Sequence, residues 1–160
     1  MSTRREARVC VMQALYAREL AGGQPESHVY TIIEPELEED PETLAFARRL
    51  FMTTVERADE VDEIIGTHTK NWDLHRITPI DRSLLRMATV ELLAFEDIPP
   101  KVSVDEAIEI AKAYSTPQSG TFVNGVLDAI LIDLEKQDRL QKSGRGLVGM
   151  EEVRRRAESS

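Results

Sequence analysis

The chain has 160 residues, enough for one helical domain or for two small packed units. Apolar residues make up 41% and aromatic residues only 5%, which favours an all-helical protein with a core of Leu, Ile, Val and Ala. The net charge of −9 excludes a protein that coats nucleic acid unspecifically, because such binding depends on Lys and Arg neutralising phosphates.

Metal, disulfide and membrane chemistry are not expected. Cys10 is the only cysteine, so no intramolecular disulfide can form, and the three histidines are far apart in the sequence. No run of 18 apolar residues occurs, and the start MSTRREAR lacks the apolar region of a signal peptide. We expect a cytoplasmic protein with no metal, no cofactor and no membrane contact.

The charge is unevenly distributed. Residues 1–8 hold three arginines and one glutamate, and residues 136–156 hold seven basic and three acidic side chains. The remainder, residues 9–135, holds ten basic and twenty-four acidic side chains, a net −14. Any RNA contact must therefore be local, and a basic partner could bind the acidic surface.

A helix is predicted over residues 4–21. Thr3 and Glu6 have the spacing of a capping box, and Gly22 and Gly23 end the apolar pattern. The arginines of this helix lie at its start, where a cation disfavours the helix dipole by a few tenths of a kcal/mol. A bound polyanion would turn this cost into a benefit. The alternative is a solvated terminus that keeps the chain in solution.

The next elements are a short helix over residues 24–33 and an acidic run over residues 34–42, which is typical of a solvated loop. Asp40 before Pro41 then predicts a helix start. The apolar pattern of this helix, with Phe46 and Leu50 behind its main stripe, continues for about 28 residues. That is long for a small domain, so we place a break near residues 57–60.

Thr78 before Pro79 predicts another helix start, and the prolines at 99 and 100 end that helix. Arg82 and Arg86 lie one turn apart outside its apolar stripe. This face is either solvated and partly ion-paired or a surface for binding protein.

Two further helices follow. Ser103 and Glu106 have capping-box spacing, and Thr116 before Pro117 repeats the start signal of a proline at the first helical position. The apolar stripe of the second helix continues through the Asn-Gly pair to residue 134, which argues against a hairpin there. Gly125 costs about 1 kcal/mol inside a helix, so it indicates either close helix packing or the approach of a partner's backbone.

Residues 141–160 carry three glycines at linker spacing and a group of arginines. We expect a flexible basic tail after a single helical domain over residues 1–140. Residues 150–158 could form a helix on binding a partner.

The motifs of common enzymes are missing: we find no glycine loop that cradles phosphate, no nucleophile elbow, no metal-ligand cluster, and no histidine and acid at catalytic spacing. The sequence therefore predicts a binding protein.

Four blocks occur in a recognisable order. They are RREARVCVMQALY, DRSLLRMATVELL, KVSVDEAIEIAKAYS and FVNGVLD. Together, over about residues 3–133, they resemble the NusB family of transcription antitermination factors. The resemblance implies an all-α fold of about seven helices in two perpendicular three- to four-helix bundles.

The resemblance also implies partners. Proteins of this family pair with the small-subunit ribosomal protein NusE, hold the boxA element of a nascent ribosomal RNA transcript, and act with RNA polymerase, NusA and NusG. Carried onto this chain, the family's RNA-binding positions are Arg4, Arg5, Arg8, Tyr16, Gln118 and Phe122. The positions expected to meet the ribosomal protein are Asp81, Arg82, Arg86 and Glu91.

Some alternatives stay open. Phe122 could stack on an unpaired base or belong to the core. The family often has a denser arginine cluster, so we expect weak RNA binding by this chain alone and a large contribution from the ribosomal partner. A homodimer could hide the arginines when that partner is absent. The competing hypothesis is a helical module that binds only protein.

Overall fold

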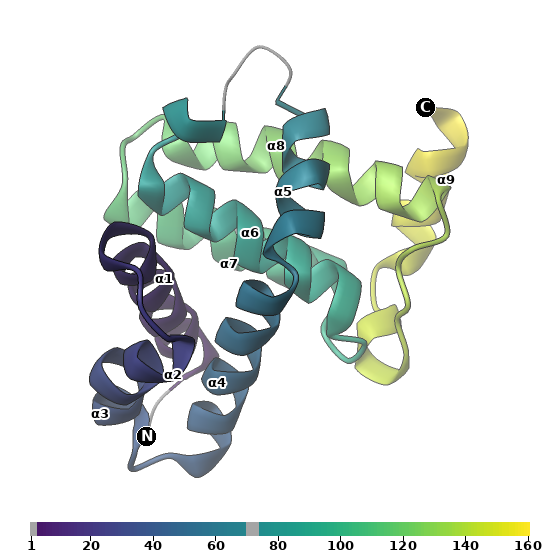
Figure 1. Ribbon diagram of the computed structural model, residues 1–160. Helices are drawn as coiled ribbons and strands as arrows, with labels where there is room; N and C mark the ends of the chain where they lie inside the picture. Colours follow the sequence, from purple (N-terminus) through teal and green to yellow (C-terminus); the bar gives the residue numbers. More distant parts are fainter. Residues whose placement is uncertain (1–2, 70–73) are drawn as a thin grey trace. The chain divides into compact units, whose positions relative to one another are not determined.

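The computed structural model describes residues 3–69 and 74–160, and the side chain of His75 lies outside this description. The regular structure in these residues is helical, which confirms the predicted all-α class. The chain divides into two compact units, Met1–Ala58 and Asp59–Ser160. Figure 1 shows the helices of both units. None of the described helices is long and apolar enough to cross a membrane.

The first unit is built on two long helices joined by short helical segments. Its elements are α1 (Arg4–Ala21), α2 (Pro25–His28), the π-helix η1 (Val29–Ile33), α3 (Glu34–Leu37) and α4 (Pro41–Glu56). The backbone N–H of Glu6 donates to Thr3 Oγ1 over 3.1 Å, which confirms the predicted start of α1. Gly22, with φ of 68°, ends this helix in a conformation that favours glycine.

Helices α1 and α4 pack against each other, and each contributes fully buried apolar side chains to the first unit. Ala7 and Val11 of α1 are 0% exposed, as are Leu50 and Phe51 of α4. Burying each large apolar side chain contributes about 1.5 to 3 kcal/mol, so the packing of these two helices contributes strongly to the stability of the unit. The start of α1 is thus fixed by the packing that follows it.

The second unit begins where the sequence predicts a break. Helix α4 ends at Glu56 and α5 (Ala58–Thr67) follows Arg57, which confirms the break expected near residues 57–60. The other elements of the unit are η2 (Leu74–Arg76), α6 (Pro79–Ala94), α7 (Pro100–Tyr114), α8 (Ser119–Lys136), η3 (Gly144–Leu147) and α9 (Met150–Ser159). Helix α6 packs against both α7 and α8.

Two predicted helix starts are wrong in detail. Helix α7 begins at Pro100, and the Ser103 hydroxyl, which is 1% exposed, donates to Glu91 Oε1 over 2.8 Å instead of capping the helix. Helix α8 begins at Ser119, two residues after Pro117. At Ser103 a tertiary contact has replaced the local capping bond that the sequence indicated, whereas Thr116 still bonds locally, with its hydroxyl 2.9 Å from that of Ser119.

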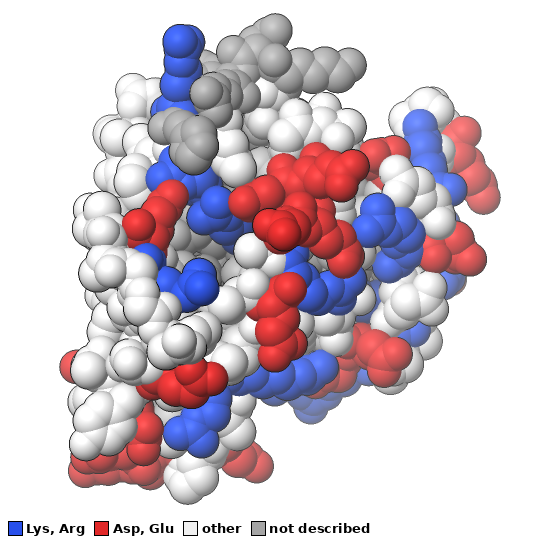
Figure 2. All heavy atoms as spheres, viewed as in Figure 1, with Lys and Arg blue, Asp and Glu red and all other residues white. Residues whose placement is uncertain are grey.

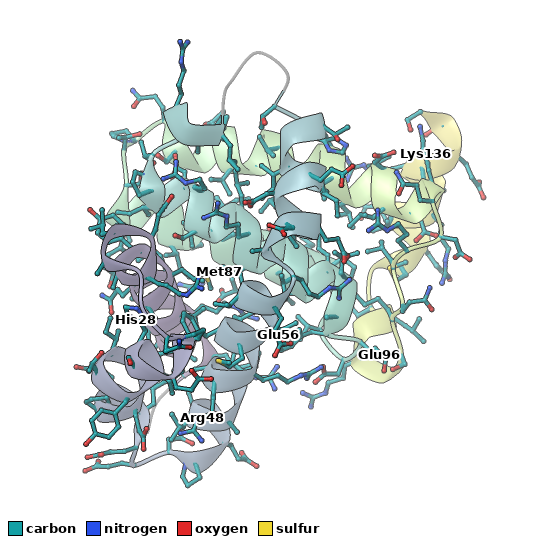
Figure 3. All side chains as sticks on the ribbon, viewed as in Figure 1. His28, Arg48, Glu56, Met87, Glu96 and Lys136 are labelled. Atoms are coloured by element: carbon teal, nitrogen blue, oxygen red, sulfur yellow. The ribbon has the colours of Figure 1, made fainter. Side chains whose placement is uncertain are left out.

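The acidic run 34–42 contains the helical turn α3 rather than only loop. Figure 2 shows acidic side chains gathered at the lower left, where Figure 1 draws α3. Glu34 of α3 pairs with Arg48 of α4 over 3.4 Å, an exposed pair that contributes little to stability. Arg48 is labelled in Figure 3.

The end of the chain also differs from the expected flexible tail, because residues 142–159 pack on the second unit. Met150 and Val153 of α9 are buried, and Arg156 pairs with Asp128 of α8 over 2.6 Å. The glycines, which indicate a linker in sequence, therefore lie in a packed segment, where Gly144 and Gly149 adopt positive φ angles of 53° and 81°.

Residues 142–146 hold the carboxyl end of α6. Lys142 Nζ donates to the carbonyl oxygens of Glu91 and Phe95 over 3.1 and 2.8 Å, and Ser143 N donates to that of Glu96 over 3.0 Å. A Cβ at Gly146 would collide with the Glu96 carbonyl, so only glycine fits there. Glu96 is labelled in Figure 3 next to this segment.

Candidate nucleic-acid interface

Three arginines, Arg4, Arg5 and Arg8, form what we call the arginine cluster at the start of α1. Arg4 and Arg5 are exposed, whereas Arg8 is only 3% exposed. Positions four residues apart share a helix face, so Arg4 and Arg8 project on the same side of α1. An anion in solution can therefore reach Arg4 and Arg5, whereas Arg8 lies beneath the surface.

An aromatic ring from α4 lies under this cluster. The guanidinium carbon of Arg4 is 4.3 Å from the centroid of the Phe46 ring, and that of Arg8 is 5.2 Å from it. Both distances are within the range of cation–π attraction. The sequence indicated Phe46 only as a member of the core, and no local pattern could have revealed a contact between segments so far apart.

Burial, with a smaller effect from nearby carboxylates, raises the pKa of the Cys10 thiol on the same helix as the cluster. The carboxylates are those of Glu36 and Glu6. Because the thiolate is the reactive form, Cys10 serves as a small buried side chain and not as a nucleophile.

Tyr16 lies further along α1. It is 37% exposed and follows Arg8 by eight residues, about 12 Å along the helix axis. An extended strand of RNA could pass from the arginine cluster to this ring, but the side chains themselves do not meet.

The remaining RNA candidates lie at the start of α8, in the second unit. Gln118 is the residue before the first turn and is exposed, and Phe122 is half-buried one turn later. Because Phe122 is neither fully buried nor fully exposed, both roles considered for it remain compatible with its position.

A buried hydroxyl ties this start of α8 to α6. Ser119 is 2% exposed, and its hydroxyl donates to Asp81 Oδ2 over 2.9 Å. Ser119 Oγ also accepts a hydrogen bond from Thr116 N over 3.2 Å and lies 2.8 Å from Ser115 Oγ. Asp81 Oδ1 is buried and has no hydrogen-bond partner among the described residues.

The residues expected to meet a protein partner are mostly internal. Asp81, Arg82 and Glu91 are 5%, 6% and 1% exposed. Arg82 Nη1 donates to the carbonyl oxygens of Leu74 and Ile77 over 3.0 and 2.5 Å. Arg82, Glu91 and one carboxylate oxygen of Asp81 bond to groups inside the second unit, so the role of these residues in binding a partner stays a prediction.

Arg86 is the most accessible of that group. It grips Asp62 of α5 with two parallel hydrogen bonds of 2.7 and 2.9 Å, and its side chain is 20% exposed. This forked pair fixes α5 to α6. Of the two interpretations of this face considered from the sequence, the partly ion-paired one fits Arg86, which pairs with Asp62.

Gly125 faces a cavity of about 630 Å³ between α5, α8 and α9. A Cβ at Gly125 would meet no atom within 4 Å among the described residues, so close packing inside the chain does not explain this glycine. His68 Nε2 lies 3.2 Å from Asp133 Oδ2 at the same cavity. No group of three or more His, Cys, Asp or Glu among the described residues could hold a metal ion.

Fold and site together define a small all-helical binding protein with a basic helix start on an acidic body. The NusB family matches residues 5–131. A transcription antitermination protein NusB of Salinibacter ruber is 60% identical over the full length of both chains. The chain belongs to the NusB family, as its four sequence blocks indicated.

Two solved structures resemble the chain closely. T. maritima NusB is 39% identical, with a TM-score of 0.75 and coverage of 81% of this chain and 90% of that one. The other is a structure of the antitermination factors NusB and NusE in complex with dsRNA. It is 28% identical, with a TM-score of 0.73 and coverage of 79% and 94%.

Proposed function

We propose that this chain is an antitermination adaptor that holds boxA-type single-stranded RNA together with the ribosomal protein NusE. It does so in the cytoplasm, within a complex that also contains RNA polymerase, NusA and NusG. It binds and does not catalyse. The observation that carries the proposal is the exposed pair Arg4 and Arg5 at the start of α1 in a chain of net charge −9.

The first unit contributes phosphate binding. The start of α1 presents the positive end of the helix dipole to an anion. Arg4 and Arg5 add forked donors that match phosphate oxygens. Arg8 adds positive charge from below, because its own burial keeps it from direct contact in this conformation.

The second unit contributes a base-stacking contact. Phe122 offers the exposed part of its ring to an unpaired base, and stacking of this kind is worth about 1 to 3 kcal/mol. Gln118 can donate to and accept from a base edge one turn away. Tyr16 of the first unit offers a further aromatic ring to the strand.

The ribosomal partner supplies the positive charge that this chain lacks. Two exposed arginines neutralise few phosphates, so the chain alone binds RNA weakly and the basic partner raises the affinity. Arg86 is the proposed residue of the partner surface that solvent reaches, whereas Asp81, Arg82 and Glu91 support that surface from within.

Retention of labelled boxA RNA on the full chain, measured with and without NusE, tests the proposal. We expect weak binding by the chain alone and strong binding by the pair, with a scrambled RNA as control. Equal retention in both would contradict the role of the partner. NusE binding with no RNA retention in either would favour the protein-only module, and sedimentation of the chain alone would reveal a homodimer.

A further inference from the structure

We propose that Phe46 is a positioning residue for RNA binding, which holds the guanidinium of Arg4 in the orientation that a phosphate requires. The inference rests on the proposed function and deepens it. The observation behind it is one ring of α4 shared by two arginines of α1, at 4.3 and 5.2 Å.

Stacking and phosphate binding use different parts of a guanidinium. The ring attracts the flat face of the cation, whereas phosphate oxygens accept hydrogen bonds from N–H groups in its plane. A carboxylate partner would occupy those N–H groups and compete with the phosphate. An aromatic partner therefore orders the arginine while leaving its edge for RNA.

The gain comes from order. A free arginine side chain has about 2 kcal/mol of rotamer entropy, part of which is lost when it binds a phosphate. Arg4 is exposed, so without a support its side chain would be among the most mobile groups on α1. The Phe46 ring is 7% exposed and fixed in the core, so it provides a rigid base for this side chain.

The shared ring also brings two positive charges close together. Arg4 and Arg8 lie one turn apart at the same ring, so their positive charges repel each other and together raise the local positive potential. A phosphate that approaches Arg4 relieves this repulsion. Arg8 thus favours RNA binding without contacting RNA, because its charge lies close to that of Arg4 at the Phe46 ring.

The test compares Phe46→Leu with Phe51→Leu in the full chain bound to NusE, with labelled boxA RNA as the probe. Phe51 lies on the same helix and is 0% exposed, and no arginine among the described residues lies over its ring, so Phe51→Leu makes the same change without a cation–π contact. We expect Phe46→Leu to weaken RNA binding about three- to tenfold and Phe51→Leu to leave it nearly unchanged. Phe46→Tyr, which keeps the ring, should restore the affinity.

A double-mutant cycle separates positioning from loss of stability. Arg4→Ala should weaken RNA binding less in the Phe46→Leu background than in the native chain, and equally in the Phe51→Leu background. The Nε–H resonance of Arg4, measured without RNA, should lose its ring-current shift in Phe46→Leu only.

Equal losses of affinity in the two leucine variants, or an unchanged cycle, would overturn the inference while leaving the proposed function intact. Failure of the native pair to bind boxA RNA would overturn the proposed function and the inference with it. Native binding with Arg4→Ala unaffected would overturn the role of the cluster itself.

Discussion

The Ser119 hydroxyl donates to Asp81 Oδ2 over 2.9 Å, and both side chains are buried. This bond joins the first turn of α6 to the first turn of α8, next to Gln118 and three residues before Phe122. Asp81, which the sequence places at a surface for a protein partner, thus anchors the start of α8, where the RNA candidates Gln118 and Phe122 lie.

Replacing Ser119 with Ala should destabilise the chain by about 1 to 3 kcal/mol. The substitution removes the hydroxyl that bonds Asp81 Oδ2, and Asp81 Oδ1 already has no hydrogen-bond partner among the described residues, so the buried carboxylate would lose this bond without a replacement. The measurement is the free energy of unfolding in urea. Ser115→Ala, at the half-buried edge of the same cluster, is the matched control and should cost less. A larger effect at position 115 would show that the Asp81 bond does not dominate.

The salt dependence of RNA binding should distinguish the exposed arginines from the buried one. Arg4→Ala with Arg5→Ala should flatten the slope of log K against log salt by about 1.4, since each phosphate contact on a single strand contributes about 0.7. Adding Arg8→Ala should lower the affinity further with little change in slope. Titration of the NusE pair against salt measures both quantities, and a third equal step at Arg8 would show that it contacts phosphate directly.

Gly125→Ala should stabilise the chain by about 0.5 to 1 kcal/mol, because alanine favours a helix and its Cβ would meet open space. At Gly120, also in α8, a Cβ would lie 3.0 Å from Lys112 Cγ, so Gly120→Ala should gain less. Thermal unfolding of the two variants checks this order. If Gly125→Ala is stable but binds NusE or RNA more weakly, a partner approaches the backbone at this position.

Lys142 should make stability depend on pH above neutrality. Desolvation by burial lowers its pKa from 10.5 to about 8 in the folded chain. Between about pH 8 and 10.5 the unfolded chain therefore binds more protons at this group, so the group's contribution to stability rises with pH. The unfolding free energy of the native chain minus that of Lys142→Met should grow between pH 7.5 and 10. A difference that shrinks over this range would contradict the lowered pKa.

Local signals in the sequence were sufficient for most helix starts. Thr3, Asp40 and Thr78 each accept a hydrogen bond from the third residue after them, as their spacing predicts. The start of α7 was wrong because Ser103 bonds to Glu91, twelve residues earlier and on another helix. Capping is decided within one turn, and it can be predicted unless a tertiary partner competes for the same hydroxyl.

The candidate site was only partly predictable for the same reason. The arginines, Gln118 and Phe122 came from motif positions in the sequence. Phe46 under Arg4, and Ser119 on Asp81, join segments 42 and 38 residues apart, and nothing in either segment signals the other. The packed carboxyl end was missed because its glycines have the spacing of a linker, whereas Gly146 is required by the neighbouring carbonyl of Glu96.

The hold of Lys142 on the end of α6 has a consequence for synthesis on the ribosome. The Glu91 and Phe95 carbonyls accept hydrogen bonds from Lys142, which is translated 51 and 47 residues after them. The carbonyls at the end of α6 therefore lack this donor until residue 142 has been made, whereas the first unit is complete in sequence by residue 58. A nascent chain stalled before residue 142 should already protect the first unit from protease and leave the end of α6 open to cleavage.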